Sequence, residues 1–167
     1  MSRIVALRSG GQSGADRGAM DAAVRCGVPA IGWCPAGGWA EDYPDPPGVL
    51  ALYPEMIETP SPEVIQRTEW NIRDSTCCIA FTAGHDGISP GTDAGFAFYE
   101  KYSIPHLELP LNSDATRDEL AAKATEWLES LDDDAIVLSI GGPRASEYEG
   151  VYDIVFNITS ALLKKFA

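Results

Sequence analysis

Short apolar runs alternate with helical patterns along the whole chain. The apolar runs that we predict to be strands are Ile4–Leu7, Val28–Trp33, Thr76–Phe81, Ile104–Leu109 and Ala135–Ile140. Their near-continuous apolar character is typical of parallel strands that helices cover on both faces. Helices fit between these strands, which favours right-handed βαβ crossovers. We therefore predict an α/β fold, with residues 1–167 forming one Rossmann-like, three-layer domain on a mostly parallel sheet of at least five strands.

The segment from about Thr116 to Leu131 has the clearest helical pattern. Thr116 and Glu119 have the spacing of a capping box, in which each side chain satisfies a backbone N–H of the first turn. An apolar stripe follows at helical spacing, which predicts a buried face; its members are Leu120, Ala124, Trp127, Leu128 and Leu131.

A glycine-rich turn, Gly10–Asp16, follows the first predicted strand and precedes an alanine-rich helix. Such a turn exposes backbone N–H groups at the positive end of a helix dipole, which favours anion binding. Arg17 lies one residue further on and adds a positive charge. The alternative is an ordinary βα turn that needs glycine only for its geometry. The turn matches neither G-x-G-x-x-G nor the P-loop pattern.

Two further loops with glycine and polar residues follow predicted strands. Gly87–Asp93 precedes a predicted helix at Ala94–Tyr102, and Gly141–Ser146 precedes the C-terminal helix. Ligands of open parallel sheets bind at the carboxyl ends of the strands, where the strand order switches. We therefore expect these loops and Gly10–Asp16 to form one pocket.

A predicted helix over Pro62–Asp74 carries a polar face, with Ser61 expected as its N-cap and Pro62 in its first turn. The polar face consists of Arg67, Asn71 and Asp74, and an adjoining apolar stripe consists of Val64, Thr68 and Ile72. Glu69 and Arg73 are four residues apart, so they could pair on the surface. A solvated face explains the polar pattern as well as a ligand site does.

Charge and composition exclude several classes of function. The net charge of −13 disfavours nucleic-acid binding, which needs a basic surface. The arginines nevertheless gather in or beside the polar motifs, which indicates a small anionic ligand; they are Arg8, Arg17, Arg67, Arg73 and Arg144. The four cysteines are interpreted as small buried hydrophobes, and His85 and His106 lack metal-ligand spacing, so no metal site is expected.

No apolar run approaches the length of a membrane span, and the N-terminus lacks the pattern of a signal peptide. We expect a cytoplasmic protein that does not contact membranes. Residues 35–60 break the α/β pattern with many Pro and Gly residues, and a loop of this length is commonly functional or a lid.

Several motifs together resemble the putative molybdenum cofactor carrier family, which belongs to a Rossmann-like superfamily shared with the cytokinin-activating phosphoribohydrolases. The residues that carry the resemblance are Ser9–Ala19, Gly32–Pro35, Ala40–Asp42, Arg67–Ser75 and Gly142–Arg144. The resemblance implies a homo-oligomeric binding protein for molybdenum cofactor, an anionic pterin phosphate. It implies a carrier or storage protein rather than an enzyme, and no catalytic residue is assigned.

The residues expected to contact the phosphorylated ligand are Gly10, Gly11, Gln12, Ser13, Gly14, Asp16, Arg17, Arg67, Asn71, Arg73, Asp74, Gly91, Thr92, Gly142 and Arg144. Two features depart from the relatives. Ala36–Trp39 stands where the family tends to carry basic residues. The loop at Gly91-Thr92 lacks the glutamate that the phosphoribohydrolases use in catalysis. The missing glutamate speaks against nucleotide hydrolysis. The alternative function is nevertheless hydrolysis of the N-glycosidic bond of a nucleotide, with Glu41, Glu69 or Asp93 as a substitute acid, or sensing of a nucleotide.

Overall fold

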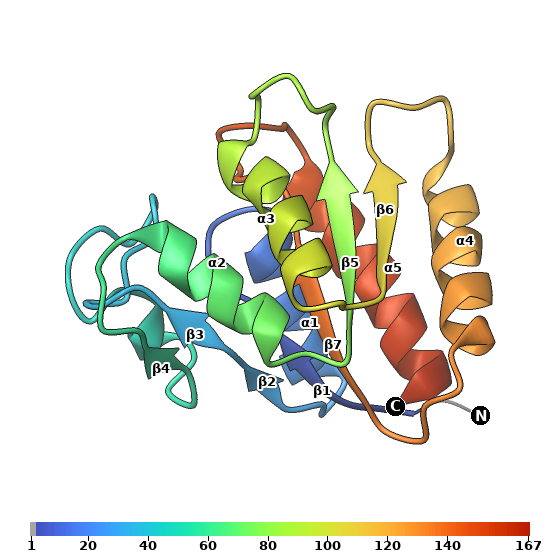
Figure 1. Ribbon diagram of the computed structural model, residues 1–167, viewed down its shortest axis with the longest axis horizontal. Coiled ribbons are helices and arrows are strands. Elements are labelled where there is room, and N and C mark those ends of the chain that lie inside the picture. Colours follow the sequence, from blue (N-terminus) through green and yellow to red (C-terminus); the bar gives the residue numbers. More distant parts are fainter. Residues whose placement is uncertain (1–2) are drawn as a thin grey trace.

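The computed structural model describes residues 3–167 and is built around a five-stranded sheet (Figure 1). Its strands are β1 (Ile4–Arg8), β2 (Ala30–Ile31), β5 (Cys77–Thr82), β6 (His106–Pro110) and β7 (Ile136–Gly141). They lie in the order β2-β1-β7-β5-β6, and every neighbouring pair is parallel. All six residues of β5 are buried, as a central strand covered on both faces requires. The predicted α/β, Rossmann-like class is confirmed.

Helices cover the two faces of the sheet unequally. The helices α1 (Ala15–Arg25), α4 (Arg117–Ser130) and α5 (Val151–Phe166) pack together on one face. The opposite face carries α2 (Val64–Arg73) and α3 (Pro90–Lys101), which pack against each other (Figure 1). The larger hydrophobic core lies under α1, α4 and α5. A small cluster lies under α2 and α3; its buried members are Ile72, Cys78, Ala80 and Tyr99.

Neighbouring residues on β5 contribute to different cores. Cys77 belongs to the large core and Cys78 to the small one, because successive side chains on a strand point to opposite faces. Burial raises the pKa of each thiol to about 12, so both are inert hydrophobic side chains at neutral pH.

The predicted capping box is present at the start of α4. The Thr116 side chain accepts a hydrogen bond from the Glu119 backbone N–H, and the Glu119 carboxylate accepts one from the Thr116 N–H. The apolar residues of α5 face inward, with Val155, Ile158 and Leu162 all buried in the large core. They are therefore unavailable for an interface with another molecule.

The predicted strand over Val28–Trp33 is wrong in its extent, because the chain changes sheets at Gly32. Residues before Gly32 form β2 of the main sheet, whereas β3 (Trp33–Cys34) pairs in parallel with β4 (Ile57–Glu58) in a separate two-stranded sheet. Gly32 has φ +152°, and a Cβ there would lie 2.0 Å from the Ser9 carbonyl oxygen. Close packing against the end of β1 therefore requires a glycine at the change of sheet.

Residues 35–60 are an ordered part of the fold. They contain a short 3₁₀ helix at Gly48–Ala51, and Ala40, Val49, Tyr53 and Met56 are buried in the large core. The long segment is therefore packed against the domain rather than free as a lid.

Two predicted helix starts also differ from the structure. The helix α2 begins at Val64 with Glu63 as N-cap, whereas Ser61 accepts the Glu63 backbone N–H through its hydroxyl in the preceding turn. The helix α3 begins at Pro90, four residues before the predicted start, because proline is favourable where the N–H lacks a helical partner. Gly91 and Thr92 therefore lie in the first turn of a helix.

No helix within residues 3–167 combines the length and the apolar character needed to cross a bilayer.

Candidate functional site

A cavity of about 80 Å³ lies at the carboxyl ends of β1 and β7, between α2, α3 and the sheet. The chain leaves β7 toward the face that α5 covers and leaves β5 toward the opposite face, which α3 covers. The two connections diverge at this point, which makes it the switch point where ligands of open α/β sheets bind.

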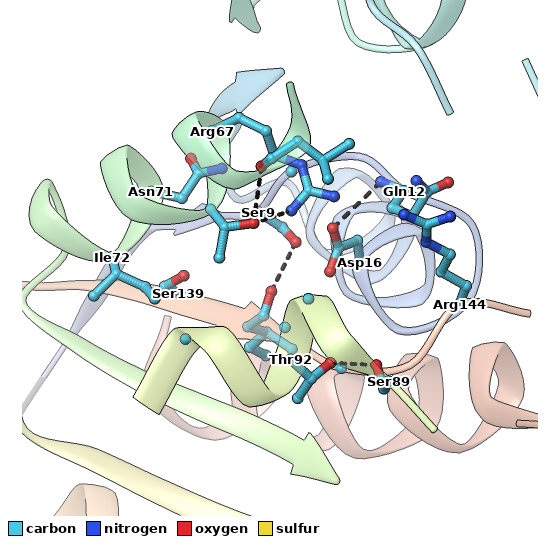
Figure 2. A pocket seen from close by; sticks show the side chains of 18 of the residues that line it. Ser9, Gln12, Asp16, Arg67, Asn71, Ile72, Ser89, Thr92, Ser139 and Arg144 are labelled. Atoms are coloured by element: carbon cyan, nitrogen blue, oxygen red, sulfur yellow. Dashed lines mark hydrogen bonds between the residues drawn. The ribbon is translucent and has the colours of Figure 1, made fainter. Parts of the chain in front are cut away.

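The three loops predicted to form one pocket all contribute to this cavity. The first loop supplies Ser9, Gly10, Gln12 and Asp16; the second supplies Ser89, Gly91 and Thr92; the third supplies Gly141, Gly142, Arg144 and Glu147. Parallel strands bring the ends of β1, β5 and β7 to one edge, so segments more than a hundred residues apart meet here (Figure 2).

One face of α2 forms a wall of the cavity. Its residues follow helical spacing and are Val64, Arg67, Thr68, Asn71 and Ile72. The Arg67 side chain crosses closely over Gly10, where an added Cβ would lie 2.8 Å from the arginine Cδ and Nε atoms. Gly10 therefore gives Arg67 the space to reach the cavity.

Two buried donors at the cavity lack a hydrogen-bond partner within residues 3–167: Nε of Arg67 and Nε2 of Gln12. The orientation of the Gln12 amide is fixed, because its Oε1 atom accepts the backbone N–H groups of Ser13 (3.0 Å) and Glu41 (2.9 Å). The NH₂ group therefore remains available. An unpaired buried donor costs about 1–3 kcal/mol, so both positions favour an acceptor such as an anionic oxygen.

Charges at the cavity are strongly perturbed by burial. Burial raises the pKa of Asp16, although the Arg67 charge and the Gln12 N–H oppose that shift. Burial also lowers the pKa of Arg67, which stays protonated because a guanidinium loses its proton only at very high pH. The cavity therefore holds a fixed cation beside a carboxyl group whose pKa is raised.

The N-terminus of α3 points its positive dipole end at the cavity. Within this helix start no side chain caps a backbone N–H, and Pro90 occupies the first turn. The Ser89 hydroxyl lies 2.8 Å from the Thr92 hydroxyl and donates to Glu147 Oε1 at 3.0 Å (Figure 2). Gly91 has open space around it, with no described atom within 4 Å of an added Cβ. This terminus fits an oxyanion.

The Gly10–Asp16 loop, by contrast, already uses several backbone donors inside the protein. The Gln12 N–H donates to Asp16 Oδ2 at 3.3 Å, and the Ala15 N–H donates to the Pro143 carbonyl at 3.1 Å. The Ser13 N–H donates to the Gln12 side chain. These contacts hold the loop against its neighbours, so much of its glycine pattern serves backbone packing rather than an exposed anion cradle.

Glu41 joins three segments beside the cavity. Its carboxylate accepts hydrogen bonds from the Ser13 hydroxyl (2.5 Å), the Ser146 hydroxyl (2.7 Å) and the Ser146 backbone N–H (3.2 Å). Burial opposes ionisation of Glu41, but the hydrogen bonds from Ser13 and Ser146 outweigh it, so the pKa of Glu41 is lowered. Glu41 thereby ties residues 35–60 to the first and third loops.

Nine of the residues predicted to contact a ligand line the cavity: Gly10, Gln12, Asp16, Arg67, Asn71, Gly91, Thr92, Gly142 and Arg144. Asn71 does so while its amide also binds both backbone polar groups of Trp33, at 2.8 and 2.9 Å. Gly142 allows close packing, since an added Cβ would lie 2.8 Å from Ala15 Cβ.

The other six predicted residues lie elsewhere. Gly11 packs against Val49 and Met56 of residues 35–60. Ser13, Gly14 and Arg17 line a separate surface depression, where Arg17 pairs with Asp42 at 2.8 Å. Arg73 and Asp74 pair with each other at the end of α2, where Asp74 also accepts the Trp33 indole N–H at 2.8 Å.

Sequence reasoning missed several lining residues, chiefly Ser9, Thr68, Ser89, Tyr99, Ser139 and Glu147. Thr68 carried a usable signal, because it follows Val64 by four residues and precedes Asn71 by three on one helix face. Tyr99 and Glu147 carried none, since only the tertiary structure brings α3 and the third loop together at the cavity.

The acids considered for hydrolysis are engaged outside the cavity lining. Glu41 binds Ser13 and Ser146, and Asp93 lies 3.3 Å from His85 Nδ1. Glu69 binds Lys101 Nζ and the Tyr102 hydroxyl, each at 2.6 Å, rather than Arg73. Asp16 and Glu147 are the carboxylates that do line the cavity.

Across residues 3–167, no group of three or more His, Cys, Asp or Glu side chains is arranged to hold a metal ion.

Comparison with known proteins identifies the family. The sequence model of the circularly permutated YpsA SLOG family matches residues 7–163. The chain belongs to this SLOG family. A solved structure of a putative molybdenum carrier protein from Syntrophus aciditrophicus is similar at 30% sequence identity, covering 97% of this chain and 96% of the other, with a TM-score of 0.84. No curated protein matches the sequence significantly.

This SLOG assignment agrees with the resemblance found in the sequence motifs. The matched range takes in the whole cavity, from Ser9 to Glu147.

Proposed function

We propose that this SLOG protein binds a small phosphorylated molecule at the switch-point cavity and carries it without converting it. The observation that carries the proposal is the pair of unpartnered buried donors, Arg67 Nε and Gln12 Nε2, at one cavity with the N-terminus of α3. Arg144 lines the same cavity and adds a second guanidinium. Charge-assisted hydrogen bonds to an anionic oxygen are about twice as strong as neutral ones.

Molybdenum cofactor, a phosphorylated pterin, is the first candidate ligand. The similarity to the Syntrophus protein supports it, as do the motifs shared with the carrier family. The cavity volume of about 80 Å³ is below the 300–1,000 Å³ typical of sites that enclose a whole organic ligand. The cavity therefore suits the phosphate end of such a ligand, with the remainder lying outside it.

A titration with inorganic phosphate, ribose 5-phosphate, GMP and purified molybdenum cofactor tests this proposal. Ligand at a hundred times its dissociation constant should stabilise the protein by about 2.7 kcal/mol, which a melting experiment detects. Arg67→Met should abolish the shift, whereas Arg73→Met, on the same helix but outside the cavity, should leave it unchanged. The proposal is wrong if none of the probes binds, or if both variants behave alike.

A second candidate is hydrolysis of a nucleotide, favoured by one observation: the buried carboxyl of Asp16 lines the cavity with a raised pKa. A carboxyl group with a raised pKa at a ligand site is typical of a general acid. Incubation with nucleoside 5′-monophosphates, followed by chromatography for free base, distinguishes this enzyme from a carrier.

The carrier family also suggests a homo-oligomer. The inward-facing residues of α5 supply no interface, so any self-association would use another surface. Sedimentation velocity over a range of protein concentrations tests this expectation.

A further inference from the structure

A second cavity of about 490 Å³, widely open to the surface, adjoins the anion cavity and has different chemistry. It is formed by residues 36–46 and the start of α2, and its walls include Trp39, Pro44, Pro46 and Pro62. Val64 and Arg144 line both cavities, so the two cavities are neighbours on either side of these side chains. A molecule anchored in the first cavity would reach the second by extending past Val64 and Arg144.

Trp39 belongs to a backbone that is fixed in place. The Gly38 carbonyl accepts the Val49 N–H at 2.8 Å, and the Gly37 N–H donates to Glu58 Oε1 at 2.7 Å. Gly38 has φ +69°, and a Cβ there would lie 2.2 Å from the Pro47 carbonyl oxygen. The position of Trp39 is thus set before any ligand arrives, which lowers the entropic cost of binding.

Arg144 links the two cavities chemically. Its guanidinium carbon lies 5.3 Å from the centre of the Trp39 ring, in a cation–π arrangement, while the same side chain lines the anion cavity. One arginine thus sits between the anion cavity and an aromatic ring. Flat walls of tryptophan and proline favour a planar ring by stacking, and Glu63 at the cavity edge offers an acceptor for ring N–H groups.

Resting on the proposed binding of a phosphorylated molecule, we infer that the second cavity is the subsite for a planar heterocycle, with Trp39 as its stacking platform. The ligand class is therefore a phosphate ester that carries a flat, N–H-bearing ring system, such as a pterin or a guanine. The phosphate lies in the cavity of Arg67 and Gln12, and the ring lies against Trp39. Trp39 determines specificity for the ring and leaves recognition of the phosphate unaffected.

Binding of ribose 5-phosphate and of GMP, measured by calorimetry, tests this inference. The first probe has a phosphate and a sugar, and the second adds a guanine. We expect GMP to bind at least tenfold more tightly to the wild-type protein, because stacking on an aromatic side chain contributes roughly this much per base. Trp39→Leu should remove this advantage while leaving the ribose 5-phosphate affinity within about twofold, and Trp39→Phe should retain most of it.

Trp70→Leu is the matched control, because Trp70 packs on Trp33 outside both cavities and should affect neither probe. If ribose 5-phosphate binds and GMP binds no more tightly, the ring subsite is wrong and the phosphate site stands. If Trp39→Leu weakens both probes equally, Trp39 only supports the structure, and the inference is again wrong. If neither probe binds the wild-type protein, the subsite inference fails, and the proposed function is then decided by the titrations with inorganic phosphate and molybdenum cofactor.

Discussion

Two of the three glycine-containing loops at the cavity use the same residue type for opposite purposes. In the Gly10–Asp16 loop, backbone donors are directed at acceptors within the protein, and Gly14 fits tightly under the third loop. At the N-terminus of α3, Gly91 has open space around it, and no side chain in this described segment caps the helix. The first loop is built for packing and the second for access. A glycine motif therefore becomes informative only when its surroundings are known.

The largest expected effect comes from adding a side chain at Gly14 in the tightly packed Gly10–Asp16 loop. Gly14 has φ +80°, and a Cβ there would lie 2.5 Å from the Pro143 carbonyl oxygen. Gly14→Ala should lower the free energy of unfolding by about 3 kcal/mol, combining backbone strain with a steric clash. Gly91→Ala is the control and should leave stability unchanged or slightly higher, because alanine favours a helix. Urea denaturation measures both, and equal effects would contradict the comparison.

Substitutions of Arg67 test whether the unpaired donors at the cavity bind an anion. Arg67→Met should weaken binding of ribose 5-phosphate by about a hundredfold, because the phosphate loses the charge-assisted hydrogen bond that the buried Nε of Arg67 would donate. Arg67→Lys should show an intermediate loss, because lysine keeps the charge but not the planar fork. Circular dichroism would verify folding of each variant. Undiminished affinity in Arg67→Met would place the anion elsewhere.

Substitution of Glu41 tests how much the tightly packed Gly10–Asp16 loop depends on one carboxylate. Glu41→Gln should destabilise the protein by about 1–2 kcal/mol at pH 7, because hydrogen bonds from Ser13 and Ser146 lose their charged acceptor. The folded-state pKa of Glu41 is lowered from 4.5, so the ionised form stabilises the fold above that pH. The difference between wild type and Glu41→Gln should therefore shrink as pH falls below about 4.5 in urea titrations. A difference that persists at low pH would exclude the charge as its origin.

The smallest effect concerns Asp16, because its ionised carboxylate repels an anion bound beside Arg67. Burial raises the pKa of Asp16. As the pH falls, a larger fraction of Asp16 is protonated, and the repulsion of the anion decreases. Affinity for sulfate, which keeps its charge at these pH values, should rise by a few-fold as the pH is lowered from 8 through the raised pKa of Asp16 in the wild type. Asp16→Asn should bind sulfate more tightly at pH 8 and lose this pH dependence. If the wild type and Asp16→Asn show the same pH profile, the pH dependence of sulfate affinity comes from another group.

Much of the fold follows from local patterns. The apolar runs locate all five strands of the main sheet, and the capping box at Thr116 marks the start of α4. The two errors have different origins. The strand after Val28 is interrupted because Gly32 packs on the end of β1, a long-range contact that no residue pattern shows. The start of α3 at Pro90 rather than Ala94 is a local feature, because proline is favourable in the first turn of a helix.

The sequence by itself determined the layers, the parallel sheet and the edge at which polar loops gather, because these depend on hydrophobic periodicity and on the direction of strands. Only the tertiary structure decided which polar groups remain available. It engages backbone donors of Gly10–Asp16 within the protein and leaves Arg67 Nε and Gln12 Nε2, in two residues that line the cavity, without a partner among the described residues. It also places Trp39 beside Arg144, a hundred residues away along the chain. The physical reason is that hydrogen-bond partners and cavity walls come from residues distant in sequence, whose meeting depends on how all the elements pack.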